Sequence, residues 1–393
     1  MMDAMIPSTS ASRLPRPGRA LALAACLGLS LVASVPAAAA FPAPHDLDPT
    51  KEHPRSSEGS FVTLRSGRIL FEYSQFSGGQ ADHSPSAIAE IFSDDQGRTW
   101  SAPRVVVPTG AYQNIMSVSL LRLASGKLAR FYAVKRNKWL DCHAVISIST
   151  DEGATWSEPR LVTDAPGYFV LNNDRVIQTA SGRLIVPLGF HRSKSTADDE
   201  SAWDGRALAL WYYSDDEGAS WKEADTWWGM PALSTSGLQE PGVVQLPDGS
   251  IYSWFRTDQG AQFESVSRDN GVTWSAPRAT ELKSPVSPAS IKRLPASNTL
   301  IAVYNDHSGS VPAPPSPKQR APLVARFSTD GARTWGPPET IESDLTGWYC
   351  YTSIHFTDDA VLLAYCAGNA EIGRLSRLRL RRIPLADLHP PKA

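Results

Sequence analysis

The chain has 393 residues, a formal net charge of −2 and no strongly basic footprint, which argues against nucleic acid or another polyanion as a general partner. Charged residues make up 20% and hydrophobic residues 42% of the chain, the balance of an ordinary globular protein. Tryptophan is abundant, with 12 residues, and most of these tryptophans belong to a repeat.

The N-terminal segment has the features of a secretory signal peptide. Three arginines precede an apolar run at 20–35, and 36–40 supplies small residues for cleavage. A membrane anchor is the alternative, but the run is shorter than the roughly 20 residues that span a bilayer. We therefore expect a signal peptide at 1–40, a single domain at 41–393 without a membrane span, and a secreted or periplasmic location.

Five octapeptides share the pattern S-x-D-x-G-x-T-W, and we call them turn boxes. They are 93–100 (SDDQGRTW), 149–156 (STDEGATW), 214–221 (SDDEGASW), 267–274 (SRDNGVTW) and 328–335 (STDGARTW). The Asp can accept hydrogen bonds from nearby backbone N–H groups and close a turn, the Gly suits positive φ, and the Trp offers a large apolar body for packing against a neighbouring unit. The third box has Ser220 in place of Thr, and the fifth has Ala332 in place of Gly.

The stretches between the turn boxes have the pattern of β-hairpins. Predicted hairpin turns lie at Ser66–Gly67, Ser125–Gly126, Ser181–Gly182 and Asp248–Gly249. No long stretch has helical periodicity. About four strands per repeat and about six repeats predict an all-β, six-bladed β-propeller. The boxes are expected on outer turns, away from the central pocket, with a structural role.

Outside the boxes, several polar residues stand where predicted strands meet loops: Arg55, Asp82, Glu240, Arg256, Arg320 and Tyr351. With these residues and the turn boxes, the chain resembles the exo-α-sialidase (neuraminidase) family, whose members are six-bladed propellers with the same turns. The resemblance runs from about Arg55 to Cys366 and is closest where Glu240 leads through a strand and an Asp-Gly turn to Arg256.

The resemblance implies a carboxylate-binding set of three arginines: Arg55, Arg256 and Arg320. Guanidinium groups suit this task because they form charge-assisted, partly bidentate hydrogen bonds with a carboxylate. Two departures from the family concern Arg55. It lacks the Ile-Pro that follows it in the family motif, and the strand that carries a supporting Glu in the family ends here in Cys366. Glu58 is a candidate for that supporting role.

The resemblance also implies a catalytic set. Tyr351 is the expected nucleophile, because a neutral phenol is not repelled by an acidic sugar, and Glu240 is the base that takes its proton. Asp82 is the expected acid/base residue for the leaving oxygen. Tyr349 is the alternative to Tyr351.

Asn173, Asp174 and Arg175 stand where the family usually has a small, Gly-rich segment. We expect these three residues at the mouth of the pocket as substrate-binding residues, with a salt bridge inside the loop as the alternative. If they face the pocket, we expect a substrate that differs from ordinary sialic acid. Three weaker candidates of the same kind are Trp139, Asp141 and His143.

The cysteines and histidines do not suggest a metal site. Cys142, Cys350 and Cys366 remain after removal of the signal, so at least one thiol is free, and Cys350 and Cys366 flank a predicted hairpin where they can pair in an oxidising compartment. No Cys/His cluster has metal-ligand spacing, and there is no Gly-rich phosphate loop. We therefore expect no metal and no other cofactor.

The most direct expectation is a secreted, monomeric exo-glycosidase that releases a terminal sialic acid or a related acidic sugar, with retention of configuration, from sialylated or other acidic glycans. Since a fold does not fix a function, two alternatives stay open. One is a glycan-binding propeller without catalysis, and the other is a hydrolase or lyase for another acidic sugar.

Overall fold

A computed structural model describes residues 41–390 except 231–232 and 296. The predicted signal peptide at 1–40 lies outside the described residues. Apart from two short 3-10 helices, η1 (Glu200–Ala202) and η2 (Leu385–Asp387), the regular structure is all β. Among the described residues, no helix is long and apolar enough to cross a membrane.

The turn boxes close through hydrogen bonds within each octapeptide. In the second box, Asp151 Oδ1 accepts the backbone N–H of Thr155 at 2.9 Å, and Ser149 Oγ accepts that of Gly153 at 2.9 Å. Glu152 and Gly153 both have positive φ, 60° and 85°. In the fifth box, Ala332 adopts φ 66° in place of glycine, a conformation that glycine takes without steric cost.

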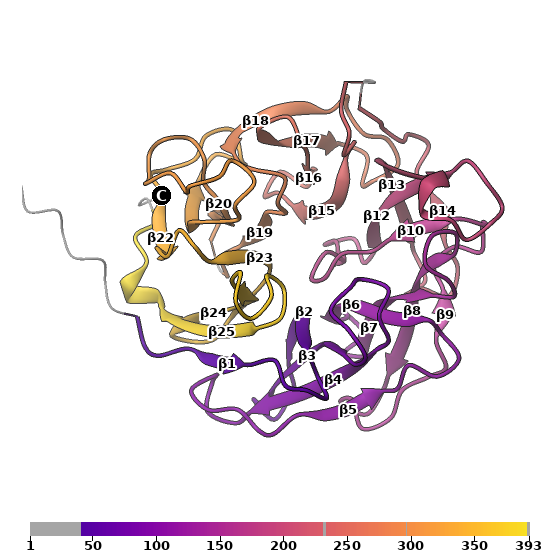
Figure 1. The fold of residues 1–393 in the computed structure, drawn as a ribbon, viewed down its shortest axis with the longest axis horizontal. Helices are drawn as coiled ribbons and strands as arrows, with labels where there is room; N and C mark the ends of the chain where they lie inside the picture. Colours follow the sequence, from indigo (N-terminus) through magenta and orange to yellow (C-terminus); the bar gives the residue numbers. More distant parts are fainter. Residues whose placement is uncertain (1–40, 231–232, 296, 391–393) are drawn as a thin grey trace, which may run out of the picture. The chain divides into compact units, whose positions relative to one another are not determined.

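Six antiparallel four-stranded units follow one another along the chain (Figure 1). The first contains β2 (Arg55–Thr63), β3 (Ile69–Phe76), β4 (Ser86–Ser93) and β5 (Arg104–Val107). The second contains β6 (Asn114–Arg122), β7 (Leu128–Lys135), β8 (Cys142–Ser149) and β9 (Arg160–Leu161). The third contains β11 (Ile177–Gln178), β12 (Leu184–Ser193), β13 (Trp203–Ser214) and β14 (Lys222–Glu223). Strand β10 (Tyr168–Val170) pairs with both β8 and β12 and joins the second and third units into one sheet.

The remaining units have the same order of strands. The fourth contains β15 (Gln239–Gln245), β16 (Ile251–Arg256), β17 (Ala261–Ser267) and β18 (Arg278–Lys283). The fifth contains β19 (Ser290–Arg293), β20 (Leu300–Asn305), β21 (Leu323–Ser328) and β22 (Glu339–Glu342). The sixth contains β23 (Trp348–Phe356), β24 (Ala360–Gly368), β25 (Leu378–Pro384) and, from the other end of the domain, β1 (His45–Leu47).

The units form a ring, and the first strands of the units lie nearest its centre (Figure 1). Inner strands of neighbouring units touch, since β2 contacts both β6 and β23, and β19 contacts both β15 and β23. The last unit thus meets the first, and pairing of β1 with β25 ties the start of the domain to its end. This arrangement confirms the predicted six-bladed propeller.

Each turn box joins the third and fourth strands of a unit, at the outer edge of the ring. The box tryptophans pack into the core between units, as Trp274 stacks on Trp211 of the preceding unit at 4.2 Å and Trp221 meets Phe131 at 6.2 Å. No box tryptophan is among the described residues that line the central cavity. The predicted structural role of the boxes is confirmed.

Candidate active site

Backbone distortions mark the centre of the ring. Of the ten non-glycine residues with positive φ in the described part of the chain, five lie in turn boxes. The other five are Glu58, Ser117, Asp174, Glu240 and Tyr351, with φ from 50° to 64°. This conformation costs a non-glycine residue about 1–2 kcal/mol and is concentrated at functional sites.

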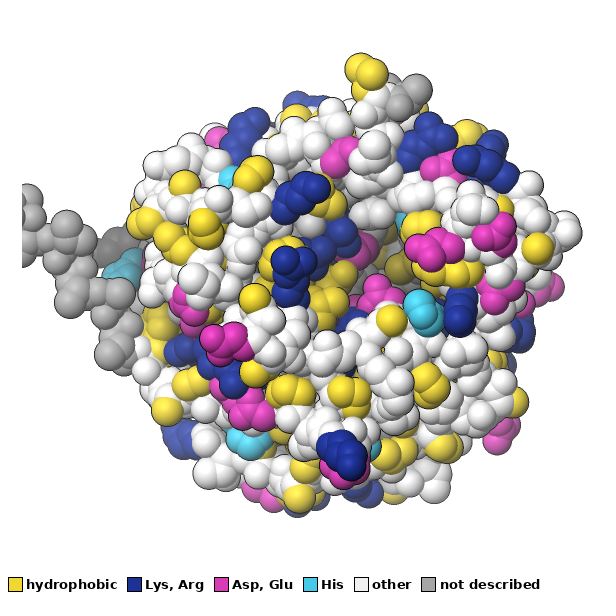
Figure 2. All heavy atoms as spheres, viewed as in Figure 1, with side chains coloured by type: hydrophobic (Ala, Val, Ile, Leu, Met, Phe, Trp, Pro, Cys, Tyr) yellow, Lys and Arg dark blue, Asp and Glu magenta, His cyan; other side chains and the backbone are white. Residues whose placement is uncertain are grey.

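Four of these residues lie where an inner strand shifts register against the strand beside it: Glu58 in β2, Ser117 in β6, Glu240 in β15 and Tyr351 in β23. Such a bulge bends the strand and redirects a side chain. All four residues line one cavity of about 470 Å³. Figure 2 shows the hollow at the ring centre, where basic and acidic side chains gather.

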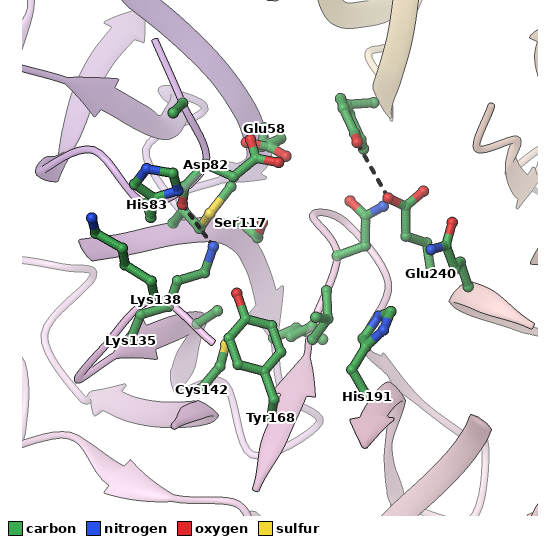
Figure 3. A pocket seen from close by; sticks show the side chains of 18 of the residues that line it. Glu58, Asp82, His83, Ser117, Lys135, Lys138, Cys142, Tyr168, His191 and Glu240 are labelled. Atoms are coloured by element: carbon green, nitrogen blue, oxygen red, sulfur yellow. Dashed lines mark hydrogen bonds between the residues drawn. The ribbon is translucent and has the colours of Figure 1, made fainter. Parts of the chain in front are cut away.

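Tyr351 and Glu240 meet in this cavity although they lie in the sixth and fourth units. The Tyr351 hydroxyl donates to Glu240 Oε1 at 3.2 Å, the dashed line at Glu240 in Figure 3. Arg256 Nη1 donates to the same oxygen at 2.6 Å. Burial raises the pKa of Tyr351 well above its ordinary value, and the Glu240 carboxylate raises it further, against the opposing charges of Arg320 and Arg256. The resting phenol is therefore neutral and already bonded to a carboxylate that can accept its proton.

Two of the three predicted arginines line the cavity, Arg256 and Arg320. The guanidinium carbon of Arg320 lies 5.4 Å from the Tyr351 ring centroid. Arg320 Nη1 and Arg256 Nε have no hydrogen-bond partner among the described residues. Both arginines thus keep unused donors beside the Tyr351–Glu240 pair.

Arg55, the third predicted arginine, is 1% exposed and is not among the residues that line the cavity. Its Nη2 donates to Glu58 at 3.1 Å, and its Nη1 donates to Asp82 at 2.6 Å and to the Gln80 carbonyl at 3.0 Å. The contact with Glu58 is the one expected from the sequence. The bond of Asp82 to Arg55 was not expected, and of the two residues only Asp82 lines the cavity.

Asp82 lies in the β3–β4 loop, across the cavity from Glu240 (Figure 3). Its side chain is 62% exposed, and its backbone carbonyl accepts a hydrogen bond from Lys135 Nζ at 2.7 Å. Desolvation in the cavity wall raises the pKa of Asp82, but the charges of Arg55 and Lys135 outweigh it and hold the pKa well below its ordinary range. In this arrangement Asp82 is an ionised carboxylate.

The structure does not place Asn173, Asp174 and Arg175 at the mouth of the cavity, and none of them lines it. Asn173 and Arg175 are buried, and Asp174 is partly exposed. All three form hydrogen bonds with residues of other units. Arg175, for example, donates to Ser290 Oγ at 3.1 Å and to the Ala289 carbonyl at 2.6 Å. The alternative was a salt bridge inside the loop. Asp174 does form a salt bridge, but its partner is Lys292 of the fifth unit, at 2.7 Å, and not a residue of the loop.

Tyr349, the alternative nucleophile, is buried in the core beside Tyr365, with ring centroids 6.3 Å apart, and does not line the cavity. Of the three weaker candidates only Trp139 lines it. Asp141 and His143 do not, and His143 packs near Phe169 at 5.5 Å.

Several residues that line the cavity were not predicted from the sequence: Ser117, Lys135, Cys142, Tyr168, His191 and Trp203. Most of these come from the second and third units, so the missed residues form one side of the cavity. Trp203 stacks on His191 at 4.4 Å and meets Trp139 at 5.5 Å. Four of the six first strands contribute a residue at a register shift, and Ser117 is the one of these four that the sequence did not single out.

Cys350 and Cys366 are direct partners across β23 and β24, and both are buried free thiols here, as is Cys142. The possible pairing of Cys350 with Cys366 is therefore not formed in this structure. Among the described residues, no group of three or more His, Cys, Asp or Glu side chains is placed to hold a metal ion.

The family model described as "BNR repeat-like domain" matches residues 67–363. The chain is 34% identical to the anhydrosialidase of Macrobdella decora over 137 residues, 32% of this chain and 16% of that protein. It is 25% identical to a sialidase of Bacteroides fragilis (strain YCH46) over 225 residues, 53% of this chain and 37% of that protein.

A solved structure, "Hadza microbial sialidase Hz136", superposes with a TM-score of 0.66 at 19% identity and covers 86% of this chain and 67% of that one. The match with it shows a shared fold. The chain spans well under half the length of the two curated relatives. Because the family model covers most of the domain, the chain belongs to the BNR repeat-like domain family, in the propeller fold that solved sialidase structures share.

Proposed function

We propose that this protein is an exo-glycosidase that releases a terminal sialic acid or a related acidic sugar from glycans with retention of configuration. Tyr351 is the nucleophile, Glu240 its base and Asp82 the acid/base residue. The observation that carries the proposal is the hydrogen bond of 3.2 Å from the Tyr351 hydroxyl to Glu240. The names of the relatives, an anhydrosialidase and a sialidase, support the same substrate class.

In the first step, Tyr351 Oη bonds to the anomeric carbon as the glycosidic C–O bond breaks. The phenolic proton moves to Glu240, and Asp82 protonates the departing oxygen. In the second step, water gives a proton to Asp82 and attacks the same carbon. The bond to Tyr351 then breaks, and Tyr351 recovers its proton from Glu240. Two displacements at one carbon leave its configuration unchanged.

The pairing of Asp82 with Arg55 sets a requirement on this sequence. An aspartate held ionised by a guanidinium cannot donate a proton. We propose that the substrate carboxylate takes the place of Asp82 on Arg55, joining Arg256 and Arg320, and that the released Asp82 regains an ordinary pKa. Asp82 is suited to this exchange because its side chain is 62% exposed, whereas that of Arg55 is 1% exposed.

The test is hydrolysis of a fluorogenic sialoside by the wild type and by Tyr351→Phe. The variant loses the attacking oxygen but keeps the buried ring, so we expect turnover to fall by about 10³-fold or more at an unchanged melting temperature. Proton NMR of the wild-type reaction should show the retained anomer first.

A folded Tyr351→Phe protein with wild-type turnover would contradict the assignment of the nucleophile. A wild type that binds acidic sugars without turning them over would support the glycan-binding alternative. We further propose that residues 1–40 direct secretion, which mass spectrometry of the protein from its native host would test through cleavage near Ala40.

A further inference from the structure

The turn at Asn172–Asp174, between β10 and β11, joins inner strands that belong to different units. Asp174 N–H donates to the carbonyl of Val118 in β6 at 3.0 Å. The Asp174 carboxylate accepts from Ser60 Oγ of β2 at 3.1 Å and from the N–H of Ile354 in β23 at 3.0 Å. One turn of the third unit thus bonds to the first, second and sixth units.

Asn173, at the centre of this turn, is completely buried. Its Nδ2 donates to the carbonyl of Gly59 at 2.9 Å and to that of Tyr351 at 3.1 Å. Gly59 follows Glu58, so a single amide bridges the bulges that carry Glu58 and Tyr351. Both of those residues have positive φ, 52° and 58°, and a conformation of this kind persists only where surrounding contacts hold it.

The turn also separates two cavities. Asn172 lines the cavity that holds Tyr351 and Glu240, whereas Asp174 lines a second cavity of about 290 Å³ together with Lys292 and Ile354. The two asparagines therefore differ in what they face, although they are neighbours in the chain. Asn173 faces protein carbonyls, and Asn172 faces the candidate active site.

Asn172 is 3% exposed. Its Oδ1 accepts the backbone N–H of Asn173 at 2.6 Å, but its Nδ2 has no hydrogen-bond partner among the described residues. A buried donor without an acceptor is costly, and a ligand oxygen that supplies the acceptor recovers that cost. A sugar in this cavity presents hydroxyl, carbonyl and carboxylate oxygens.

We propose that the two adjacent asparagines have separate tasks. Asn172 is a specificity-determining residue that donates a hydrogen bond through Nδ2 to an oxygen of the bound acidic sugar. Asn173 is a positioning residue that holds the main chain of Tyr351, and so its hydroxyl, against Glu240. The proposal rests on the proposed function for its kinetic part, because the task of Asn173 is defined by attack from Tyr351.

The two tasks affect different kinetic parameters. A contact made equally in the ground state and the transition state changes KM, whereas a shift of the attacking oxygen changes kcat. A displacement of about 1 Å at a reacting group can cost about 100-fold in rate. Loss of one neutral hydrogen bond to the substrate weakens binding about tenfold.

The experiment compares Asn172→Ala and Asn173→Ala, with Ser60→Ala as the matched control. Ser60 is buried and donates to Asp174 of the same turn, but among the described residues it has no side-chain hydrogen bond with Tyr351 and does not line the cavity. We measure kcat and KM on a fluorogenic sialoside, and the affinity for the 2,3-didehydro derivative of sialic acid by calorimetry. Asn172→Ala should raise KM and weaken the analogue about tenfold at near wild-type kcat. Asn173→Ala should lower kcat about 100-fold at near wild-type affinity.

Ser60→Ala should change the melting temperature alone. If Asn173→Ala does not fold, Asn173→Ser, which keeps one hydroxyl donor, replaces it and should show a smaller loss of kcat. The positioning role is overturned if a folded Asn173 variant keeps wild-type kcat, and the binding role is overturned if Asn172→Ala binds the analogue like the wild type.

Two readouts do not depend on turnover. The calorimetric affinity tests Asn172 even if the wild type hydrolyses no sialoside, in which case it is the proposed function that has failed. For Asn173, the ring carbon signal of Tyr351 in ¹³C-tyrosine-labelled protein should shift in Asn173→Ala and stay in place in Ser60→Ala. An unshifted signal in Asn173→Ala would refute the positioning role directly.

Discussion

Tyr349 and Tyr351 show how one residue's backbone angle decides the chemistry of this site. In a regular strand, residues two apart point to the same face. The register of β23 against β24 shifts between Cys350 and Ser353, and Tyr351 has φ 58°. Tyr349 therefore enters the core beside Tyr365 while Tyr351 reaches Glu240 in the cavity.

The charge on Asp82 predicts that kcat and kcat/KM depend differently on pH. As a general acid it must be protonated, so activity falls as pH rises through its pKa. In the free protein Arg55 and Lys135 hold that pKa below its ordinary range. In the exchange that we propose, the substrate carboxylate replaces Asp82 on Arg55, and the pKa of Asp82 rises. The alkaline limb of kcat, which reports the complex, should therefore lie at higher pH than that of kcat/KM, which reports the free enzyme.

Full pH profiles of both parameters on one fluorogenic sialoside check this expectation. Asp82→Asn serves as the control, because it removes the titrating carboxyl and should abolish the dependence along with most of the activity. Coincident alkaline limbs in the wild type would show that Asp82 does not leave Arg55 when substrate binds.

At the scale of the element, the turn boxes share one hydrogen-bond pattern but have different neighbours. Gly97 and Gly153 hold the same place in the first and second boxes, with φ 83° and 85°. A Cβ on Gly97 would lie 2.6 Å and 2.8 Å from the two methyl groups of Leu362, in the neighbouring sixth unit. A Cβ on Gly153 would find its nearest atom, on Leu70, at 3.6 Å.

Both Gly97→Ala and Gly153→Ala should lose about 1 kcal/mol of unfolding free energy, because alanine is strained at positive φ. Gly97→Ala should lose about 1–3 kcal/mol more, because buried Leu362 must move. Urea unfolding of the two variants measures the difference. Equal losses would mean that the box turns are not packed tightly against the preceding unit.

Strand β1 closes the ring of the whole molecule by pairing with β25. Two aspartates in or beside β1 bind arginines of the last unit. Asp46 makes two hydrogen bonds of 2.8 Å to Arg379, with side chains 22% and 17% exposed. Asp48, 59% exposed, bonds to Arg377.

Asp46→Ala should lower the free energy of unfolding by about 1.5–3 kcal/mol, because the partly buried guanidinium of Arg379 loses both of its hydrogen bonds to the Asp46 carboxylate. Asp48→Ala removes an exposed ion pair and should cost about 0–1 kcal/mol. Thermal and urea unfolding of both variants measure the contrast. A loss for Asp46→Ala no larger than that for Asp48→Ala would show that the pairing of β1 contributes little to stability.

The repeat, and with it the fold, can be predicted from the amino-acid sequence. The bonds that shape a turn box run within eight residues, as from Asp151 to Thr155, so the octapeptide carries its own structure wherever it occurs. Five copies, with hairpins between them, leave a propeller as the natural architecture. The pairing of Glu240 with Arg256 was also within reach, because Glu240 follows Gln239, which is the partner of Arg256 across one hairpin.

The rest of the site depends on contacts between different units of the ring. The bonds of Asn173 to Gly59 and Tyr351 join residues 114 and 178 positions apart, and no local pattern encodes such a partner. The same holds for the bulge between Cys350 and Ser353 and for the salt bridge from Asp82 to Arg55. Local hydrogen bonds and apolar periodicity belong to the sequence, whereas the direction of a side chain at the centre of a ring depends on how all the units meet.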